Sequence, residues 1–345
     1  MVMTGRLNRI IVFGIIVLAC ALIAEGSRNA CAAREEYKIH IHGAAQQTNG
    51  QFITFGWGDL INKNSSWLRS TVSEELAPGI SVPLFVMKPE IRKTDIMFAI
   101  CGQPQGWSKG LPPLSPKTPY KTWKVICKTL TAPAMLVTSD PNIKTIHDLE
   151  GKRISCLPRT STAGIGLLNI IEHGAGLKGK VKIDFLGPPP AKDALLSGLV
   201  DAAHLPFGSA DPTWIFPGIA VEILAAKKLN FVDLTKEAMD KTYKEVDWPY
   251  MPPIHVPAGA FTPEQKAFWT FGIPNYYACD EVLPDEVVYE MLRIMYDHVD
   301  EFKNYHAVGK ALTRERLGDI AVPVEGIHPA AKKFFDEKGI KYGMY

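Results

Sequence analysis

The residues best suited to chemistry in this sequence are two histidines and a cysteine beside apolar segments. His40 and His42 share one face of a predicted strand, and Cys156 ends the apolar residues 153–156. Two histidines on a strand can bind a metal only with further ligands, and no third ligand lies nearby in the sequence. A cysteine on a predicted strand is typical of a core thiol. We therefore expect no metal site at the histidine pair and no nucleophile at Cys156.

The motifs that mark common enzyme classes do not occur. The sequence has no HExxH, GxSxG or GxxxxGK[ST] motif and no CxxC pair. Cys101, Cys156 and His204 are the loose candidates for a catalytic group. We therefore predict a protein that is not an enzyme and that has no catalytic residues, no metal and no cofactor.

Three loops have the position at which α/β proteins bind ligands. Such ligands lie outside the carboxyl ends of strands, where loops meet helix N-termini. The loops follow predicted strands and span residues 56–66, 157–162 and 204–208. We take these loops as the candidate ligand site.

The second loop makes the clearest case for binding an anion. Thr160, Ser161 and Thr162 lie at the start of a predicted helix, where unpaired N–H groups and the positive dipole end favour an anion. Their hydroxyls and the Arg159 guanidinium add directional donors for a carboxylate. The alternative is an ordinary helix N-cap beside a solvated arginine.

The other loops supply groups for the rest of a ligand. Trp57 and Phe207 suit the wall of a pocket, although either could pack between elements instead. Asp59 can accept a hydrogen bond from an amino or hydroxyl group. Gln103 and His204, which also follow predicted strands, complete the candidate set.

Apolar segments of strand length alternate with helical patterns along most of the chain. Strands are predicted at residues 37–42, 52–55, 95–100, 134–138, 153–156, 181–185 and 199–203. Helical patterns cover residues 67–76, 145–149, 162–171, 191–197, 285–302 and 329–338, and a capping box predicts a helix start at 262–265. Five prolines predict an irregular loop at 104–121. The alternation predicts an α/β fold with largely parallel sheets.

The composition is that of a globular protein, with 46% hydrophobic and 21% charged residues. A chain of 345 residues is long enough for two ordinary domains. The formal net charge is only +2, so the sequence lacks the global basic charge typical of nucleic-acid binding. We expect no nucleic-acid partner.

The first 33 residues have the three-part layout of a secretory signal peptide. Two arginines precede the apolar residues 10–24, and small residues at 30–33 suit cleavage after Ala33. The apolar run is shorter than the roughly 20 residues of a spanning helix. A lipoprotein anchored at Cys20 is disfavoured, because the apolar segment continues beyond that cysteine. We therefore predict a soluble periplasmic protein that is not integral to the membrane.

Four cysteines follow the predicted signal peptide, namely Cys101, Cys127, Cys156 and Cys279. An oxidising compartment permits disulfides, but the wide spacing of these residues in a large chain does not require any. We expect most of them to be buried free thiols.

Four stretches of the sequence match one known family. They are residues 51–58 (QFITFGWG), 143–154 (IKTIHDLEGKRI), 193–203 (DALLSGLVDAA) and 321–339 (AVPVEGIHPAAKKFFDEKG). Together they resemble solute-binding proteins of the TAXI type, the periplasmic component of TRAP transporters. The DLEGKRI segment is common to many periplasmic binding proteins, whereas the C-terminal stretch is more specific to TAXI proteins. Agreement is weak between residues 60 and 130.

The resemblance implies a two-lobed periplasmic-binding-protein fold, with a mostly parallel sheet in each lobe and a ligand cleft between the lobes. The first lobe would comprise residues 34–134 and 255–345, and the second lobe residues 135–254. The resemblance further implies an extracytoplasmic solute receptor that closes around an organic anion and delivers it to TRAP membrane permease subunits. Such a receptor catalyses nothing, and we expect it to be a monomer.

The ligand loops differ from the family pattern. The first loop reads GWGDLINKNSS where the family has small residues, and the second reads PRTSTAG in place of GSGT. We therefore expect a carboxylate with an aromatic or partly apolar body instead of glutamate. Arg159 and residues 160–162 would hold the carboxylate. Trp57 and Phe207 would contact the apolar part, and Asp59 an amino or hydroxyl group.

Three alternatives stay open. The chain could be a solute receptor for an ABC importer or a sensor kinase, although its TAXI-like C-terminal stretch argues against the importer. It could be a periplasmic enzyme on the same fold. It could also be an adaptor that no longer binds small solutes.

Overall fold

The computed structural model describes residues 34–46, 48–74, 82–100, 102–111, 118–159, 161–206, 208–209, 214–215, 218–247 and 251–343. The chain divides into an N-terminal segment, Met1–Tyr37, and one compact unit, Lys38–Tyr345. The predicted signal peptide, Cys101, Thr160 and Phe207 lie outside the described residues. Within the described ranges, no helix is long and apolar enough to cross a membrane.

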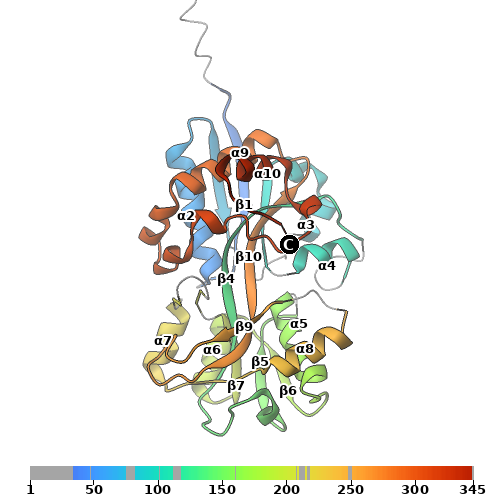
Figure 1. Cartoon of the computed structure of the whole chain (residues 1–345), viewed down its shortest axis with the longest axis vertical. Coiled ribbons are helices and arrows are strands. Elements are labelled where there is room, and N and C mark those ends of the chain that lie inside the picture. Colours follow the sequence, from blue (N-terminus) through green and yellow to red (C-terminus); the bar gives the residue numbers. More distant parts are fainter. Residues whose placement is uncertain are drawn as a thin grey trace, which may run out of the picture. The chain divides into compact units, whose positions relative to one another are not determined.

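The strands form one ten-stranded sheet in the order β2-β1-β3-β10-β4-β7-β5-β6, with β8 beside β4 and β9 beside β10 (Figure 1). The strands are β1 (Tyr37–His42), β2 (Leu68–Ser73), β3 (Asp95–Ile100), β4 (Trp123–Thr138), β5 (Arg153–Cys156), β6 (Lys182–Phe185), β7 (Ala202–Pro206), β8 (Asn230–Phe231), β9 (Pro253–Val256) and β10 (Phe268–Asp280).

Helices connect most of these strands. The α-helices are α2 (Asn49–Asn64), α3 (Val82–Met87), α4 (Gln103–Lys109), α5 (Thr162–Asn169), α6 (Pro188–Ser197), α7 (Gly218–Ala226), α8 (Lys236–Glu245), α9 (Asp285–Asp297) and α10 (Pro329–Lys338). A π-helical turn, Ile170–Gly174, extends α5. Short 3-10 helices lie at Pro89–Lys93, Ile146–Leu149, Val299–Asn304, Ala307–Ala311, Arg314–Arg316 and Val324–Gly326.

Two long antiparallel strands, β4 and β10, join two halves of the compact unit (Figure 1). On one side β1 and β3 pair in parallel, and we call them, with β2, α2–α4, α9 and α10, the first lobe. On the other side β5 pairs in parallel with both β6 and β7, and these strands with α5–α8 form the second lobe. The crossing strands link both parallel groups into one sheet. The predicted two-lobed α/β fold is thus confirmed.

Each lobe has a core on its part of the sheet. All six residues of β3 are buried, as expected for a strand covered on both faces. In the first lobe the Tyr277 ring contacts the rings of Trp57 and Phe98, with centroids 4.6 Å and 5.8 Å away. In the second lobe, apolar residues of β4 and β7 pack against α6 and α7, among them Val137 and Leu205. Each lobe therefore holds its loops on a packed sheet.

Helix α2 replaces two predicted elements. The strand predicted at 52–55 and the loop predicted at 56–66 are wrong, because residues 49–64 are helical. Thr48 caps this helix by accepting a hydrogen bond from the main-chain N–H of Gln51 at 3.4 Å. Its aromatic and β-branched residues have strand propensity, but such preferences yield when one helix face is buried in a core.

Three further predictions need correction. Residues 68–73 form the strand β2 beside β1, where a helix was predicted at 67–76. The proline-rich segment 104–121 begins with α4, because a proline in the first helical turn loses no internal hydrogen bond. Residues 262–265 form turns without a helix. There the Gln265 side chain bonds the main chain of Pro257 and Phe261, so the capping-box glutamine serves a turn.

Predictions based on helix ends are confirmed. Helix α6 ends at Gly198, whose φ of 76° is readily adopted only by glycine. The Leu199 N–H bonds back to the Ala194 carbonyl at 2.9 Å, which delays the next strand to Ala202. Helix α10 begins after His328 and ends before Gly339, as its pattern predicts.

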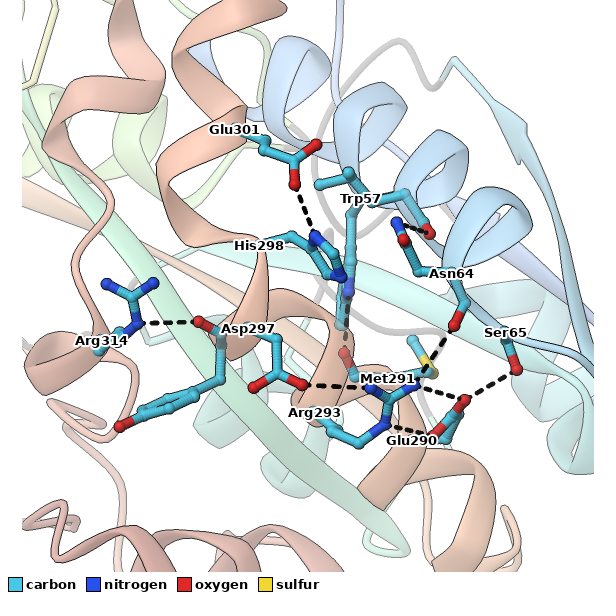
Figure 2. A network of polar contacts seen from close by, with 12 residues as sticks. Trp57, Asn64, Ser65, Glu290, Met291, Arg293, Asp297, His298, Glu301 and Arg314 are labelled. Atoms are coloured by element: carbon cyan, nitrogen blue, oxygen red, sulfur yellow. Dashed lines mark hydrogen bonds and ion pairs between the residues drawn. The ribbon is translucent and has the colours of Figure 1, made fainter.

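Polar contacts fix α9 against the end of α2 (Figure 2). Arg293 bonds Glu290 at 2.8 Å and Asp297 at 3.1 Å along its own helix. Glu290 also accepts a hydrogen bond from Ser65 at 2.8 Å, just beyond the last residue of α2. These contacts lie within the first lobe and hold α2 in place.

Candidate functional site

An apolar pocket lies between the two lobes, where several loops meet the crossing strands. Its walls come from the first lobe (Ala44, Ala45, Thr48, Asn49, Gly50, Phe98 and Ile100), the crossing strands (Ala132, Ile273 and Asn275) and the second lobe (Leu157, Pro158, Ser161 and Pro188). None of these described lining residues carries a charged side chain. The pocket suits a small ligand with an apolar body.

Three helices begin at the pocket. Asn49 is the first residue of α2, Ser161 is the N-cap of α5, and Pro188 is the first residue of α6. Each helix follows a strand of a parallel pair, so all three N-termini lie at carboxyl ends of strands. At α2 and α5, unpaired N–H groups and the positive dipole end favour an anion without a charged side chain. Helix α6 begins with three prolines, which have no N–H, so it contributes only its dipole.

Two buried polar atoms at the starts of α2 and α5 have no partner within the described residues. The Asn49 side chain is 4% exposed, and its Oδ1 has no hydrogen-bond partner among the described residues. Thr162, at the start of α5, is fully buried, and its Oγ1 likewise lacks a partner within the described ranges. A buried polar atom without a hydrogen bond lowers the stability of the folded state by about 1–3 kcal/mol, and a hydrogen bond to a polar ligand group would offset this loss.

The predicted second loop lies at the pocket. Ser161 lines it, and its side chain makes no hydrogen bond to the helix N-terminus. Arg159 lies between the lining residues Pro158 and Ser161 in sequence, but its side chain is exposed. The Arg159 guanidinium stacks over the Phe185 ring, 3.9 Å from the ring centroid. Arg159 is thus adjacent to the lining residues in sequence but does not itself line the pocket.

The two candidates from the predicted first loop do not line the pocket. Trp57 is fully buried in the first-lobe core, and its Nε1–H donates to the Met291 carbonyl at 3.1 Å (Figure 2). Asp59, on the outer side of α2, accepts hydrogen bonds from Lys63 and Tyr305. The hydrogen bond from Lys63, followed by that from Tyr305, lowers the pKa of Asp59. Both positions differ from expectation because residues 56–64 are helical.

His204 is buried in β7 and does not line the pocket. It pairs with Leu136 of β4, and its ring contacts Phe271 edge-on at 5.9 Å. Alternation along β4 puts Leu136 on the same sheet face as the lining residue Ala132. His204 is 1% exposed, and burial lowers its pKa to about 3, so the ring is neutral. Neither ring nitrogen has a hydrogen-bond partner in the described part of the chain.

Gln103 has a structural contact of its own. It is fully buried at the start of α4, and its Oε1 accepts a hydrogen bond from the Ile100 N–H at 2.9 Å. Ile100 lines the pocket, whereas Gln103 does not. Gln103 therefore shapes the end of β3.

Sequence reasoning missed one loop that lines the pocket. This loop, residues 43–48, follows β1 and supplies the lining residues Ala44, Ala45 and Thr48, and it leads directly into Asn49 and Gly50 at the start of α2. Two features of the sequence indicate this loop: the small residues after the strand predicted at 37–42, and Thr48, which is a typical helix N-cap. The mistaken strand at 52–55 hid both signals.

The remaining chemical candidates have ordinary partners. His40 bonds the Thr71 and Ser73 hydroxyls at 2.8 Å and 2.9 Å, and His42 bonds Asp95 at 2.8 Å. The described residues contain no group of three or more His, Cys, Asp or Glu placed to hold a metal.

The described cysteines are buried free thiols. The prediction of buried free thiols is confirmed for Cys127, Cys156 and Cys279. Burial raises the pKa of Cys156 to about 12, so it is a neutral thiol and a poor nucleophile.

Gly164 lets the second loop lie against α5. A Cβ at Gly164 would overlap the Leu157 carbonyl oxygen and lie 2.8 Å from that of Pro158. Gly164→Ala should therefore displace the loop and lower the free energy of unfolding by about 2 kcal/mol. Urea denaturation measures this change. Gly187→Ala is the matched control, because nothing lies within 4 Å of its Cβ position. Equal effects of both substitutions would contradict the close packing.

Several solved structures have the same fold. A periplasmic transporter matches with a TM-score of 0.53 and 11% identity, over 89% of this chain and 95% of that chain. The periplasmic binding protein BugD matches with a TM-score of 0.51 and 11% identity, over 90% and 99%. MatC from Rhodopseudomonas palustris, with bound malate, matches with a TM-score of 0.52 and 12% identity, over 88% and 97%.

The sequence also matches a family model. The NMT1-like family model covers residues 91–339, which include both crossing strands and the whole second lobe. The solved structures share the two-lobed fold of periplasmic binding proteins. The chain therefore belongs to the NMT1-like family.

Proposed function

We propose that this protein is an extracytoplasmic solute receptor that binds a small organic anion between its lobes. The observation that carries this proposal is the meeting of two helix N-termini with free N–H groups, α2 of the first lobe and α5 of the second, at one apolar pocket. That arrangement favours an anionic group at the helix ends and an apolar body against the walls. The fold shared with periplasmic binding proteins supports it.

The ligand in this proposal is a carboxylate with an aromatic or partly apolar body. Phe98, Ile100 and Ile273 supply apolar walls, and burial of apolar surface contributes about 25 cal/mol per Å². Ser161 and the N–H groups of α2 and α5 would hold the carboxylate, together with Arg159. The malate bound to MatC supports an organic acid as the class of ligand.

The partner in this proposal is a TRAP-type membrane permease. Closure around the solute would create the shape that the permease recognises. The TAXI-like stretch 321–339, which contains α10, supports this partner. A receptor for an ABC importer or a sensor kinase is the alternative.

Further parts of the proposal follow from this role. Residues 1–33 would be a cleaved signal peptide that directs the protein to the periplasm. The lobes would comprise residues 34–134 with 255–345, and residues 135–254. The protein would act as a monomer without cofactor or catalysis. Burial of the Cys156 thiol raises its pKa, which makes it a poor nucleophile and supports this part of the proposal at that residue.

Native mass spectrometry of the purified protein, before and after partial unfolding and dialysis, tests the proposal. A small acid that copurifies and leaves unaltered on unfolding is the expected result. If the protein is empty, a thermal-shift screen of carboxylates follows, because a ligand at 100 times its Kd stabilises by about 2.7 kcal/mol. No binding in either experiment would move the adaptor alternative ahead.

Arg159→Ala should weaken binding of a carboxylate found in that screen by about tenfold at low salt. The Arg159 side chain is exposed to solvent, so the loss should shrink at high salt. Titration calorimetry at two salt concentrations measures both effects. Arg153→Ala is the matched control, because that exposed arginine already pairs with Asp184 at 2.7 Å. Unchanged affinity in Arg159→Ala would remove Arg159 from the site.

A further inference from the structure

A hydrogen bond crosses the cleft at the pocket. The Asn49 Nδ2 at the start of α2 donates to the main-chain carbonyl of Gly208, 159 residues later in the chain. Asn49 belongs to the first lobe, and Gly208 lies just beyond β7 of the second lobe. Since Asn49 also lines the pocket, one side chain contacts both the opposite lobe and the ligand space.

The chemistry of this hydrogen bond determines where the nitrogen and the oxygen of the Asn49 side-chain amide lie. A main-chain carbonyl can only accept hydrogen bonds, so the atom that contacts Gly208 must be the nitrogen. The other end, Oδ1, is therefore an acceptor, and it is buried without a hydrogen-bond partner among the described residues. An acceptor in that state is matched by a ligand that donates a hydrogen bond.

Both ends of the contact are held by the main chain. The Asn49 backbone lies beside Gly50, where a Cβ would overlap the Phe98 ring. Gly208 has a φ of 69°, and a Cβ there would overlap the Ile215 carbonyl. The adjacent Ser209 N–H donates to the same carbonyl at 2.9 Å. Asn49 and the Gly208 carbonyl therefore have little freedom to move apart within their own lobes.

We propose that Asn49 determines ligand specificity and couples it to lobe closure. Its Oδ1 accepts a hydrogen bond from a hydroxyl or amino group next to the ligand carboxylate, while its Nδ2 holds the opposite lobe. The preferred class of ligand is then a 2-hydroxy or 2-amino acid over the plain acid of the same skeleton. A ligand that orients Asn49 in this way binds the closed arrangement better and shifts the population toward it. This inference rests on the proposed function.

A second contact between the lobes supplies a control. Lys109 of α4 and Asp247, which follows α8, form an ion pair at 2.9 Å. Their side chains are 49% and 89% exposed, so solvent screens the pair. Lys109→Gln removes a contact between the lobes without touching the pocket.

The experiment compares two matched pairs of acids on wild type, Asn49→Ala and Lys109→Gln. The pairs are 3-phenyllactate with 3-phenylpropionate and malate with succinate, which differ only by one hydroxyl. Titration calorimetry gives affinities, and small-angle X-ray scattering gives the decrease in radius of gyration on binding. If Asn49→Ala does not fold, Asn49→Ser replaces it, because its shorter side chain cannot span the cleft.

For any pair of acids that binds, wild type and Lys109→Gln should bind the hydroxy acid at least about tenfold more tightly than the plain acid. Asn49→Ala should bind both members within about twofold and show a smaller decrease in radius. A wild type without preference, or an Asn49 variant that keeps it, would overturn this inference and leave the proposed function standing. If wild type binds none of the four acids, the comparison uses another carboxylate that binds in the thermal-shift screen. That carboxylate is then compared with the form of it that carries one more hydroxyl at C2. Failure of every carboxylate would overturn the proposed function and this inference together.

Discussion

Trp57→Ala should lower the free energy of unfolding by about 4 kcal/mol, a large effect for one substitution. The indole is fully buried and lies 4.6 Å from the Tyr277 ring, centroid to centroid. Truncation leaves a cavity that the sheet and α9 cannot fill. It also removes the hydrogen bond from the indole Nε1–H to the Met291 carbonyl. Urea denaturation near neutral pH measures the loss.

Trp57→Phe is the matched control for this result. It keeps an aromatic ring in the core but removes the Nε1–H donor, so the loss should be about 1–2 kcal/mol. If Trp57 walled the ligand pocket instead, Trp57→Ala would leave stability almost unchanged and would weaken ligand binding. That outcome would contradict the placement of this side chain in the core.

The stability of the protein should fall in mild acid because His204 is buried in its neutral form. Burial lowers the pKa of His204 to about 3, whereas an unfolded histidine has a pKa of 6.5. The unfolded chain therefore gains a proton that the folded chain does not. The contribution of His204 to the free energy of unfolding is fully present above about pH 6.5. It decreases by about 1.4 kcal/mol per pH unit as the pH falls from there toward 3.

Comparison of wild type with His204→Leu isolates this effect from the carboxylates that both proteins share. Between about pH 7 and about pH 5, wild type should lose about 2 kcal/mol more than the variant. Urea denaturation at both pH values gives the difference. His147→Leu, at an exposed histidine, should behave as wild type does. Parallel losses in wild type and His204→Leu would show that His204 is not buried and neutral.

These two residues show how the site differs from its predicted form. Trp57 and His204 were both expected to contact the ligand, yet Trp57 belongs to the first-lobe core and His204 is buried in β7 beside β4, and neither lines the pocket. The large side chains in the candidate loops serve packing. The loops contribute small and polar residues to the pocket, such as Ala44, Asn49 and Ser161, beside the apolar walls supplied by residues of the strands such as Phe98 and Ile273.

The sequence alone determined the features that depend on local chemistry. The strand–loop–helix unit from Arg153 to Asn169 could be predicted from its apolar run and its hydroxyl-rich N-terminus. Gly198 and Gly339 ended their predicted helices because both adopt a positive φ that other residues avoid. The position of one loop that lines the pocket, at residues 157–162, followed from these local signals.

Only the tertiary structure decided which segments meet at the pocket. Residues 52–55 have the composition of a strand, but burial of one helix face against α9 outweighs that propensity. The bond from Asn49 to Gly208 joins residues 159 apart, and no local signal relates them. Burial and cross-lobe contact depend on the packing of whole elements, and so the side chains that line the pocket could not be chosen from the sequence.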